Sequence, residues 1–116
     1  MTHQLNFVYN DSDWIAPAEY PDLRQAKEIA IDLETKDPNI KTKGAGWATF
    51  DGGIVGFAVA ALGQQWYFPI QHDAGGNMDL TITTAWFQDV LKLPATKIFH
   101  NASYDVGWLL VNGFEI

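Results

Sequence analysis

The stretch Ile29–Thr35 limits the fold more than any other part of the sequence, because its pattern predicts a short buried strand that ends in two acids. Ile29 and Ile31 are β-branched, which favours a strand. Residues two apart in a strand lie on one face, roughly 6.5–7 Å from each other, so Asp32 and Glu34 are same-face neighbours. Two carboxylates in an apolar strand are costly unless a positive group lies between them. A hard divalent cation such as Mg²⁺ prefers such oxygens, and we therefore expect a metal site at Asp32 and Glu34.

The composition is that of a globular protein about the size of one domain. The chain has 116 residues, of which 47% are hydrophobic and 18% charged, so disorder is not expected. It contains no cysteine, which excludes disulfides and thiolate metal sites and fits a reducing cytoplasm. No signal peptide and no apolar stretch of membrane-spanning length is found, so we expect a cytoplasmic protein without a membrane partner.

The charge of the chain bears on the kind of partner. A formal net charge of −7 argues against a general basic nucleic-acid binder. It argues less against a metal-dependent nuclease, because bound cations would cancel part of the charge at the site. Lys36, Lys41 and Lys43 cluster just after the acidic strand. A solvated loop is the simpler role for these lysines, and phosphate contact is the alternative.

Patterns along the chain predict a mixed α/β sheet. Residues 1–22 are expected to be an irregular lead-in, in which Leu5, Phe7 and Tyr9 alternate as in a short strand. Turn signals at 51–53 and 63–64 then separate three strands of an antiparallel meander. The region 35–46 is expected to be a polar loop and 47–50 to be weakly extended. The expected strands are 28–33, 54–62, 65–70 and 97–100.

Two helices are predicted in the second half of the chain. The first covers Thr81–Leu91, with a threonine at 81, 83 or 84 as its cap, and Pro94 prevents its continuation. Its expected apolar stripe is Ile82, Ala85, Trp86, Val90 and Leu91. The short, buried fourth strand follows this helical crossover, so it should run parallel to a meander strand. The last helix is capped by Asn101 or Ser103 and ends near Gly113.

Asp105 is the third acid that bears on chemistry. It falls near the start of the last helix, where a simple acid favoured by the helix dipole is the alternative role. If the fourth strand lies beside Ile29–Thr35, three carboxylates converge at the carboxyl edge of the sheet. Without metal, at least one of their pKa values should then be raised. Two cations roughly 3.5–4 Å apart could activate a water and hold the leaving oxygen of a phosphodiester.

Two motifs resemble those of the DEDD 3′–5′ exonucleases. Ile29–Thr35 resembles the first motif, with its Asp-x-Glu core, and Asn101-Ala102-Ser103-Tyr104-Asp105 resembles the second, Asn-x-x-x-Asp. The glycine-rich stretch Asp51–Ala60 and the stretch Tyr67–Asp73 occur in the family's order and at similar spacing. The detail is similar to the proofreading domain of family A DNA polymerases, particularly phage-type ones, and the similarity covers residues 20–112.

This resemblance implies an RNase H-like fold and a two-metal exonuclease. Asp32, Glu34 and Asp105 would hold two divalent ions, Mg²⁺ or Mn²⁺, and Thr35 and Asn101 would lie near the 3′-terminal nucleotides. The implied reaction hydrolyses the terminal phosphodiester of DNA at a single-stranded or frayed 3′ end. A DNA polymerase module, in the same or another chain, is the implied partner.

The family's third motif, Tyr-x-x-x-Asp or a His version, supplies a fourth acid and lies well downstream of the second. It is missing before Ile116, so we expect residues 23–116 to be the amino-terminal part of an exonuclease domain. Tyr9–Asp13 fits the motif at the wrong end and is attributed to chance. One alternative is a non-catalytic remnant that binds nucleic acid or packs against a polymerase module. Another is a phosphohydrolase with Asp32 as covalent nucleophile, which leaves Asn101–Asp105 unexplained.

Overall fold

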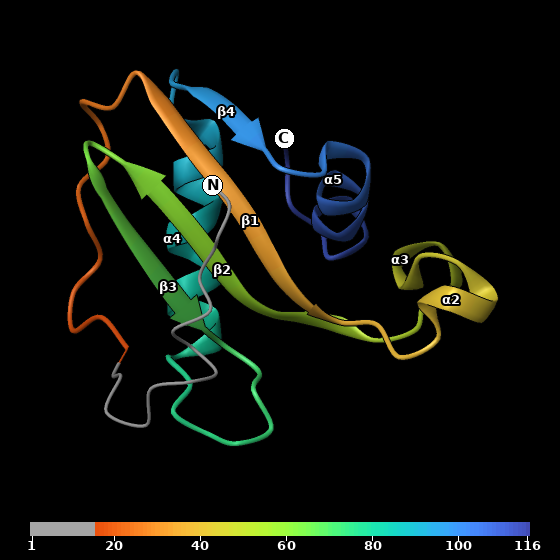
Figure 1. Ribbon diagram of the computed structural model, residues 1–116. Coiled ribbons are helices and arrows are strands. Elements are labelled where there is room, and N and C mark those ends of the chain that lie inside the picture. Colours follow the sequence, from red (N-terminus) through yellow and green to blue (C-terminus); the bar gives the residue numbers. More distant parts are fainter. Residues whose placement is uncertain (1–15) are drawn as a thin grey trace.

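The computed structural model describes residues 16–116 and shows a four-stranded mixed sheet with a long helix across one face (Figure 1). The strand order is β3-β2-β1-β4, in which β1, β2 and β3 form an antiparallel meander and β4 runs parallel to β1. The predicted α/β class, the meander and the parallel fourth strand are confirmed. The strand predicted at 5–9 lies outside the described residues, as does the segment Tyr9–Asp13 that fits the third-motif pattern. The strands are β1 (Glu28–Lys36), β2 (Gly53–Ala61), β3 (Gln64–Pro69) and β4 (Thr96–Phe99).

Backbone in the left-handed region occurs at the turn between β2 and β3 and at the entry to β2. Leu62 (φ 54°) and Gly63 (φ 73°) form the two-residue connection from β2 to β3, as expected for a hairpin turn that matches strand twist. Gly52 has φ 87°, and a Cβ atom there would lie 1.8 Å from the carbonyl oxygen of Lys36. Only glycine therefore fits the chain as it enters β2, as the sequence predicted.

The long helix α4 (Leu80–Lys92) begins at a different cap from the one predicted. The carboxylate of Asp79 accepts a hydrogen bond from the Ile82 N–H at 2.8 Å, so none of the three threonines is the cap. The predicted apolar stripe is also wrong in part, because Ile82 is 58% exposed. The buried side chains of α4 are Thr83, Phe87, Val90 and Leu91.

A hydrogen bond explains why a threonine lies on the buried face of α4. The hydroxyl groups of Thr83 and Tyr20 are 2.6 Å apart, so the polar atom of Thr83 has a partner inside the protein. Tyr20 also lies against Trp86 and Phe68, with ring centroids 5.2 and 5.8 Å away. The segment before β1 thus covers part of the core instead of leaving it to solvent.

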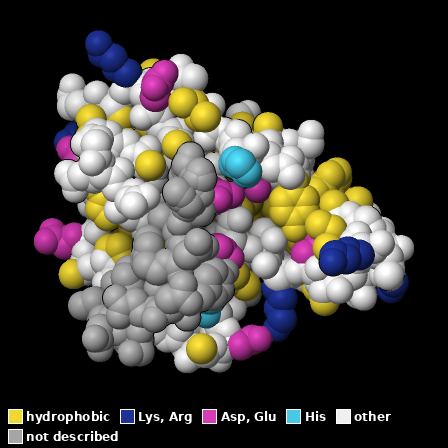
Figure 2. All heavy atoms as spheres, viewed as in Figure 1, with side chains coloured by type: hydrophobic (Ala, Val, Ile, Leu, Met, Phe, Trp, Pro, Cys, Tyr) yellow, Lys and Arg dark blue, Asp and Glu magenta, His cyan; other side chains and the backbone are white. Residues whose placement is uncertain are grey.

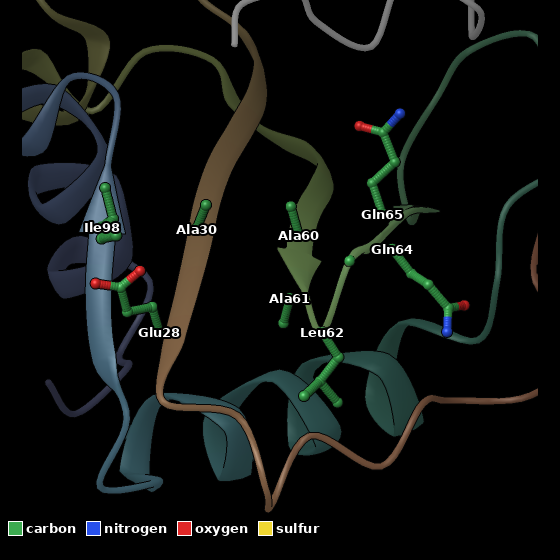
Figure 3. Close-up of a pocket in the computed structure, with 9 residues that line it drawn as sticks. Glu28, Ala30, Ala60, Ala61, Leu62, Gln64, Gln65 and Ile98 are labelled. Atoms are coloured by element: carbon green, nitrogen blue, oxygen red, sulfur yellow. The ribbon is translucent and has the colours of Figure 1, made fainter.

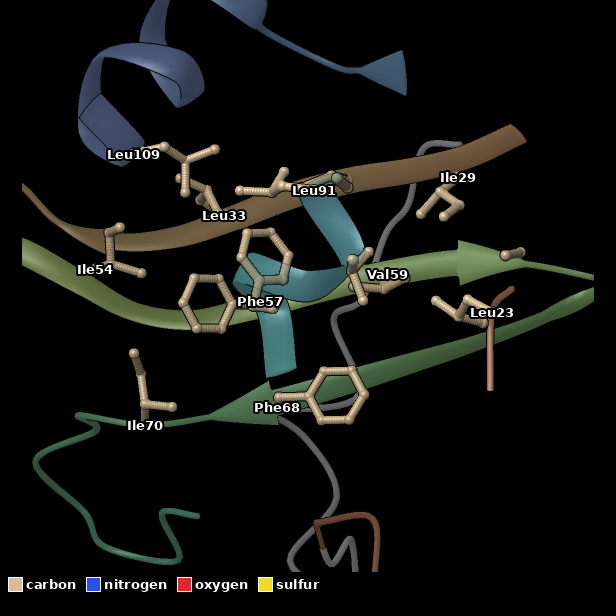
Figure 4. Close-up of a cluster of buried hydrophobic side chains, with 14 of the residues drawn as sticks. Leu23, Ile29, Leu33, Ile54, Phe57, Val59, Phe68, Ile70, Leu91 and Leu109 are labelled. Carbon is tan, nitrogen blue, oxygen red and sulfur yellow. The ribbon is translucent and has the colours of Figure 1, made fainter. Parts of the chain in front are cut away.

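The hydrophobic core lies between α4 and one face of the sheet (Figure 4). Phe57 of β2 stacks on Phe87 of α4, with ring centroids 4.2 Å apart, and both side chains are fully buried. Figure 4 also shows Leu109 of the last helix close to Leu33 of β1. The last helix is α5 (Ala102–Val111). The same core joins the sheet to α4 and to α5, and α5 is thereby held against β1.

Three predictions of local structure need correction. The region after β1 contains the short helices α2 (Ile40–Lys43) and α3 (Gly46–Thr49) where a polar loop and an extended segment were expected. β1 itself continues to Lys36. β4 is a half-exposed edge strand, with Ile98 46% exposed, because among the described strands it pairs only with β1.

Within residues 16–116, no helix is long and apolar enough to cross a membrane.

Candidate active site

Asp32 and Glu34 lie on the face of β1 that points away from α4. Ile31 and Leu33, which alternate with the two acids, are buried in the core, and the acids are half-buried, so the predicted same-face arrangement is confirmed. In β2, Ala58 is the register partner of Asp32 and Gly56 is that of Glu34. A Cβ atom on Gly56 would lie 2.0 Å from the Tyr67 hydroxyl, so the buried Tyr67 fills the place beside Glu34 that a larger residue at position 56 would take.

Asp105 is brought to the same region by the parallel pairing of β4 with β1. Ile31, which precedes Asp32, pairs with Phe99 at the end of β4, and α5 begins three residues later. Asp105 is only 2% exposed, and its Oδ2 atom has no hydrogen-bond partner in the described part of the chain. Burial, and secondly the charge of Asp32, raise the pKa of the Asp105 carboxyl to about 7, although a hydrogen bond from the Asn101 backbone opposes the shift. Asp32 and Asp105 are thus close enough for their charges to interact.

The structure therefore brings together two of the three predicted acids. Glu34 shares the face of Asp32 and has interactions of its own. Among residues 16–116, no group of three or more His, Asp or Glu side chains is arranged to hold a metal ion. The oxygens of Asp32 and the orphaned oxygen of Asp105 suit a hard divalent cation, which would also relieve their mutual repulsion. The metal site thus stays a prediction, with two of its ligands in proximity.

The two residues predicted to contact nucleic acid differ in their surroundings. The Thr35 hydroxyl is 3.0 Å from the Tyr104 hydroxyl, and at this point the register between β1 and β2 skips Val55 of β2. Asn101 is exposed just before α5, and its side chain makes no capping hydrogen bond. An exposed amide at a helix start can reach a phosphate or base, whereas Thr35 is partly committed within the protein.

Tyr104 and Asp37 connect α5 to the segment that follows β1. The Tyr104 hydroxyl donates to Asp37 Oδ2 at 2.7 Å, and the Gly46 N–H donates to the same oxygen at 2.9 Å. Burial, together with the neighbouring Asp37, raises the pKa of Tyr104 above its ordinary value, so the hydroxyl keeps its proton. These bonds fix α5, and with it Asp105, relative to the end of β1.

We use the term α2–α3 lobe for residues 37–52, which pack against α5. A Cβ atom on Gly107 would lie 2.4 Å from the Trp47 ring, and one on Gly46 would lie 3.0 Å from the Trp108 ring. Glycine thus permits the close approach of the lobe to α5. The buried side-chain polar atoms without a partner in the described residues all belong to this junction: Asp37 Oδ1, Trp47 Nε1, Asp105 Oδ2 and Trp108 Nε1. Such atoms are costly in a fold, so this junction is a place to look for a bound water, ion or ligand.

The sequence did not identify Asp37 and Tyr104 as residues that position the site. Asp37 lies in what was expected to be a loop, and a tyrosine beside Asp105 looks like a packing residue. The one available signal was Gly107, because a glycine inside a helix indicates a close approach of other atoms. The partner in that approach, Trp47, could not be known before the lobe was folded.

A hollow of about 500 Å³ lies along the same face of the sheet, towards the start of β1 (Figure 3). Ala30 and Ala60 line its floor, and Glu28, Gln65 and Ile98 are among its walls. Ala30 precedes Asp32 by two residues and so shares its face of β1. The hollow contains none of the predicted site residues.

Comparison with known proteins gives one informative similarity. No family model matches the chain. The chain is 33% identical over 114 residues to a protein described as a DNA-directed DNA polymerase from Pseudomonas phage M6, an alignment that covers 94% of this chain. The chain spans only 17% of the length of that relative. It is therefore similar to one region of a phage DNA polymerase.

Proposed function

We propose that this chain forms part of a metal-dependent 3′–5′ exonuclease domain of a DNA polymerase, with an RNase H-like fold. The observation that carries the proposal is the buried Asp105, whose carboxyl is close enough to Asp32 for their charges to interact and whose Oδ2 atom has no hydrogen-bond partner among residues 16–116. The two sequence motifs and the similarity to a phage DNA polymerase region support the same assignment. Residues 23–116 would be the amino-terminal part of that domain.

Asp32, Glu34 and Asp105 are the residues that would hold Mg²⁺ or Mn²⁺. When bound, divalent ions would lower the pKa of a water and stabilise the charge of the leaving oxygen. A bound cation would favour the ionised form of Asp105, because its charge would offset the burial and the repulsion from Asp32 that raise the pKa of that carboxyl. Asn101 and Thr35 would contact the 3′-terminal nucleotides of a single strand, and Tyr104 and Asp37 would hold α5 in place.

A second candidate function has a specific observation in its favour. The described residues contain no three-acid group that could hold a metal ion, as expected of a chain that contacts nucleic acid or a polymerase module without cutting. In this case Asp105 would be a structural acid of α5. The two functions differ in whether divalent metal binds at Asp32.

A thermal experiment tests the metal site without relying on activity. Mg²⁺ or Mn²⁺ should raise the Tm of the wild-type chain, and Asp32→Ala should remove that rise. Glu28→Ala is a matched control, because Glu28 lies on the same face of β1 at its far end. An equal rise in the Asp32→Ala variant would exclude the site.

A cleavage experiment tests the reaction. A 5′-labelled single-stranded DNA should shorten one nucleotide at a time from its 3′ end in the presence of metal, and Asp105→Asn should stop this. A ladder of internal cuts would contradict an exonuclease. Binding without any cleavage would favour the second candidate, and release of phosphate alone would favour the phosphohydrolase.

A further inference from the structure

Phe50, at the end of α3, is unusually exposed for an aromatic residue. Its side chain is 85% exposed, more than any other large hydrophobic residue in the described part of the chain. Its backbone is left-handed, with φ 58° and ψ 44°, a conformation that costs a non-glycine residue free energy. The fold thus bears two costs at Phe50 and gains little packing from its ring. A strained residue of this kind is a reason to look for a function.

The lysines of the same α2–α3 lobe carry charges that are available to a partner. Lys41 and Lys43 form the basic last turn of α2 and are exposed. Across residues 16–116, neither takes part in an ion pair, whereas Lys36 just before the lobe pairs with Asp73 at 2.7 Å. In Figure 2, yellow and dark blue side chains gather over this lobe, on the right of the view.

The acids of the lobe are used inside it and do not neutralise these lysines. Asp37 accepts from Gly46 and Tyr104, and Asp51 accepts from the Asn39 amide at 2.6 Å. The outer surface of the lobe therefore combines an exposed aromatic ring with positive charge, in a chain whose net charge is −7. This combination matches single-stranded nucleic acid, whose bases stack on aromatic rings and whose phosphates are negative.

The lobe is also held in a defined position relative to the candidate site. Trp47 of α3 packs against Gly107 of α5, two residues after Asp105, and Tyr104 bonds to Asp37. A strand bound at Phe50 would thus lie at a set distance from Asp32 and Asp105. A surface on a flexible linker would have no such relation to the acids.

We propose that Phe50, with Lys41 and Lys43, binds the single-stranded nucleic acid that leads into the candidate site. The Phe50 ring stacks on a base, and the two lysines contact phosphates of the same strand. This inference rests on the proposed function, because it assigns the strand that the acids would act on. It adds a binding surface outside the two motifs from which that function was recognised.

Fluorescence anisotropy of a labelled single-stranded oligonucleotide, in chelator so that no cleavage occurs, tests this surface. Phe50→Asn removes the ring but keeps a residue that tolerates the left-handed backbone, and should weaken binding roughly ten-fold. Phe50→Trp should bind at least as tightly as wild type. Leu62→Asn is the matched control, because Leu62 is also left-handed and 53% exposed, and should leave affinity unchanged.

The lysines are tested by salt dependence. Replacing Lys41 and Lys43 by alanine should reduce the slope of log affinity against log salt by about 0.7 for each phosphate that the variant no longer neutralises. Urea denaturation midpoints equal to that of wild type would show that the variants are folded.

Each outcome of these measurements decides between the proposals. The proposed surface is supported if Phe50→Asn binds more weakly than wild type while Phe50→Trp and Leu62→Asn keep the wild-type affinity. Equal binding by wild type and Phe50→Asn overturns it and leaves the exonuclease proposal standing. Equal competition by blunt duplex DNA overturns the preference for single strands. If the wild-type chain binds no single strand at all, the surface is overturned, and the thermal and cleavage experiments with metal decide the proposed function separately.

Discussion

Replacing Asp105 with asparagine removes a buried negative charge while keeping the shape of the side chain. Between pH 4 and pH 7 the folded chain holds a proton on Asp105, because its pKa there is about 7, whereas the unfolded chain, with an ordinary value of 3.8, has lost it. The folded state thus binds more protons in this window. The free energy of unfolding of the wild-type chain must therefore fall as the pH rises.

The size of this effect follows from the shift in pKa. Each pH unit within the window corresponds to about 1.4 kcal/mol, so raising the pH from 5 to 8 should cost on the order of 3 kcal/mol. Asp105 is 2% exposed, so solvent screens this charge little. The two described acids with pKa values lowered by ion pairs, Asp22 and Asp73, titrate below this range and do not mask the effect.

Urea denaturation followed by tryptophan fluorescence, in chelator at pH 5 and pH 8, measures the free energy of unfolding of wild type and of Asp105→Asn. Wild type should lose stability between the two values, and Asp105→Asn should lose much less, so that the variant becomes the more stable protein at pH 8. Trp108, which is 3% exposed, provides a buried fluorophore in the same helix. An identical pH dependence in wild type and variant would refute the claim that burial of Asp105 raises its pKa.

Three further predictions concern the packing that positions the site, each measured by urea denaturation. Gly107→Ala should destabilise by roughly 1–3 kcal/mol, although alanine favours helices, because its Cβ would lie 2.4 Å from the Trp47 ring; an increase in stability would mean that the lobe does not pack there. Tyr104→Phe should cost about 1–3 kcal/mol by leaving Asp37 without its hydroxyl donor, and should speed proteolysis within the α2–α3 lobe; unchanged proteolysis would argue that this bond does not hold the lobe. Phe57→Ala should cost about 3–5 kcal/mol because its ring is fully buried; a loss below about 1 kcal/mol would contradict the described core.

Local chemistry was enough to predict the elements whose conformation depends on near neighbours. The alternation in Ile29–Glu34 gave the face of each acid, because side chains alternate along any strand. The left-handed turns at Gly52 and Gly63, and the stop at Gly113 with φ 87°, follow from the freedom of glycine. None of these predictions needed knowledge of a distant residue.

The wrong cap of α4 was a local error, because Asp79 lies only three residues before Ile82, but other mistaken predictions depended on contacts between distant residues. Thr83 lies on the buried face of α4 because Tyr20 offers it a hydrogen bond, 63 positions away in the chain. The region after β1 folds into α2 and α3, where Asp37 holds both Gly46 and Tyr104. Helices of four residues have too few internal hydrogen bonds to leave a periodic pattern in the sequence.

The sequence by itself determined that Asp32 and Glu34 share a face of one strand, because that spacing is built into the backbone. Only the tertiary structure decided that Asp105 is buried beside Asp32, and that the described side chains stop short of a three-acid metal group. The physical reason is that the pKa of a carboxyl depends on what surrounds it in space. For Asp105 those surroundings come from β1, β4 and α5, which meet only when the sheet forms.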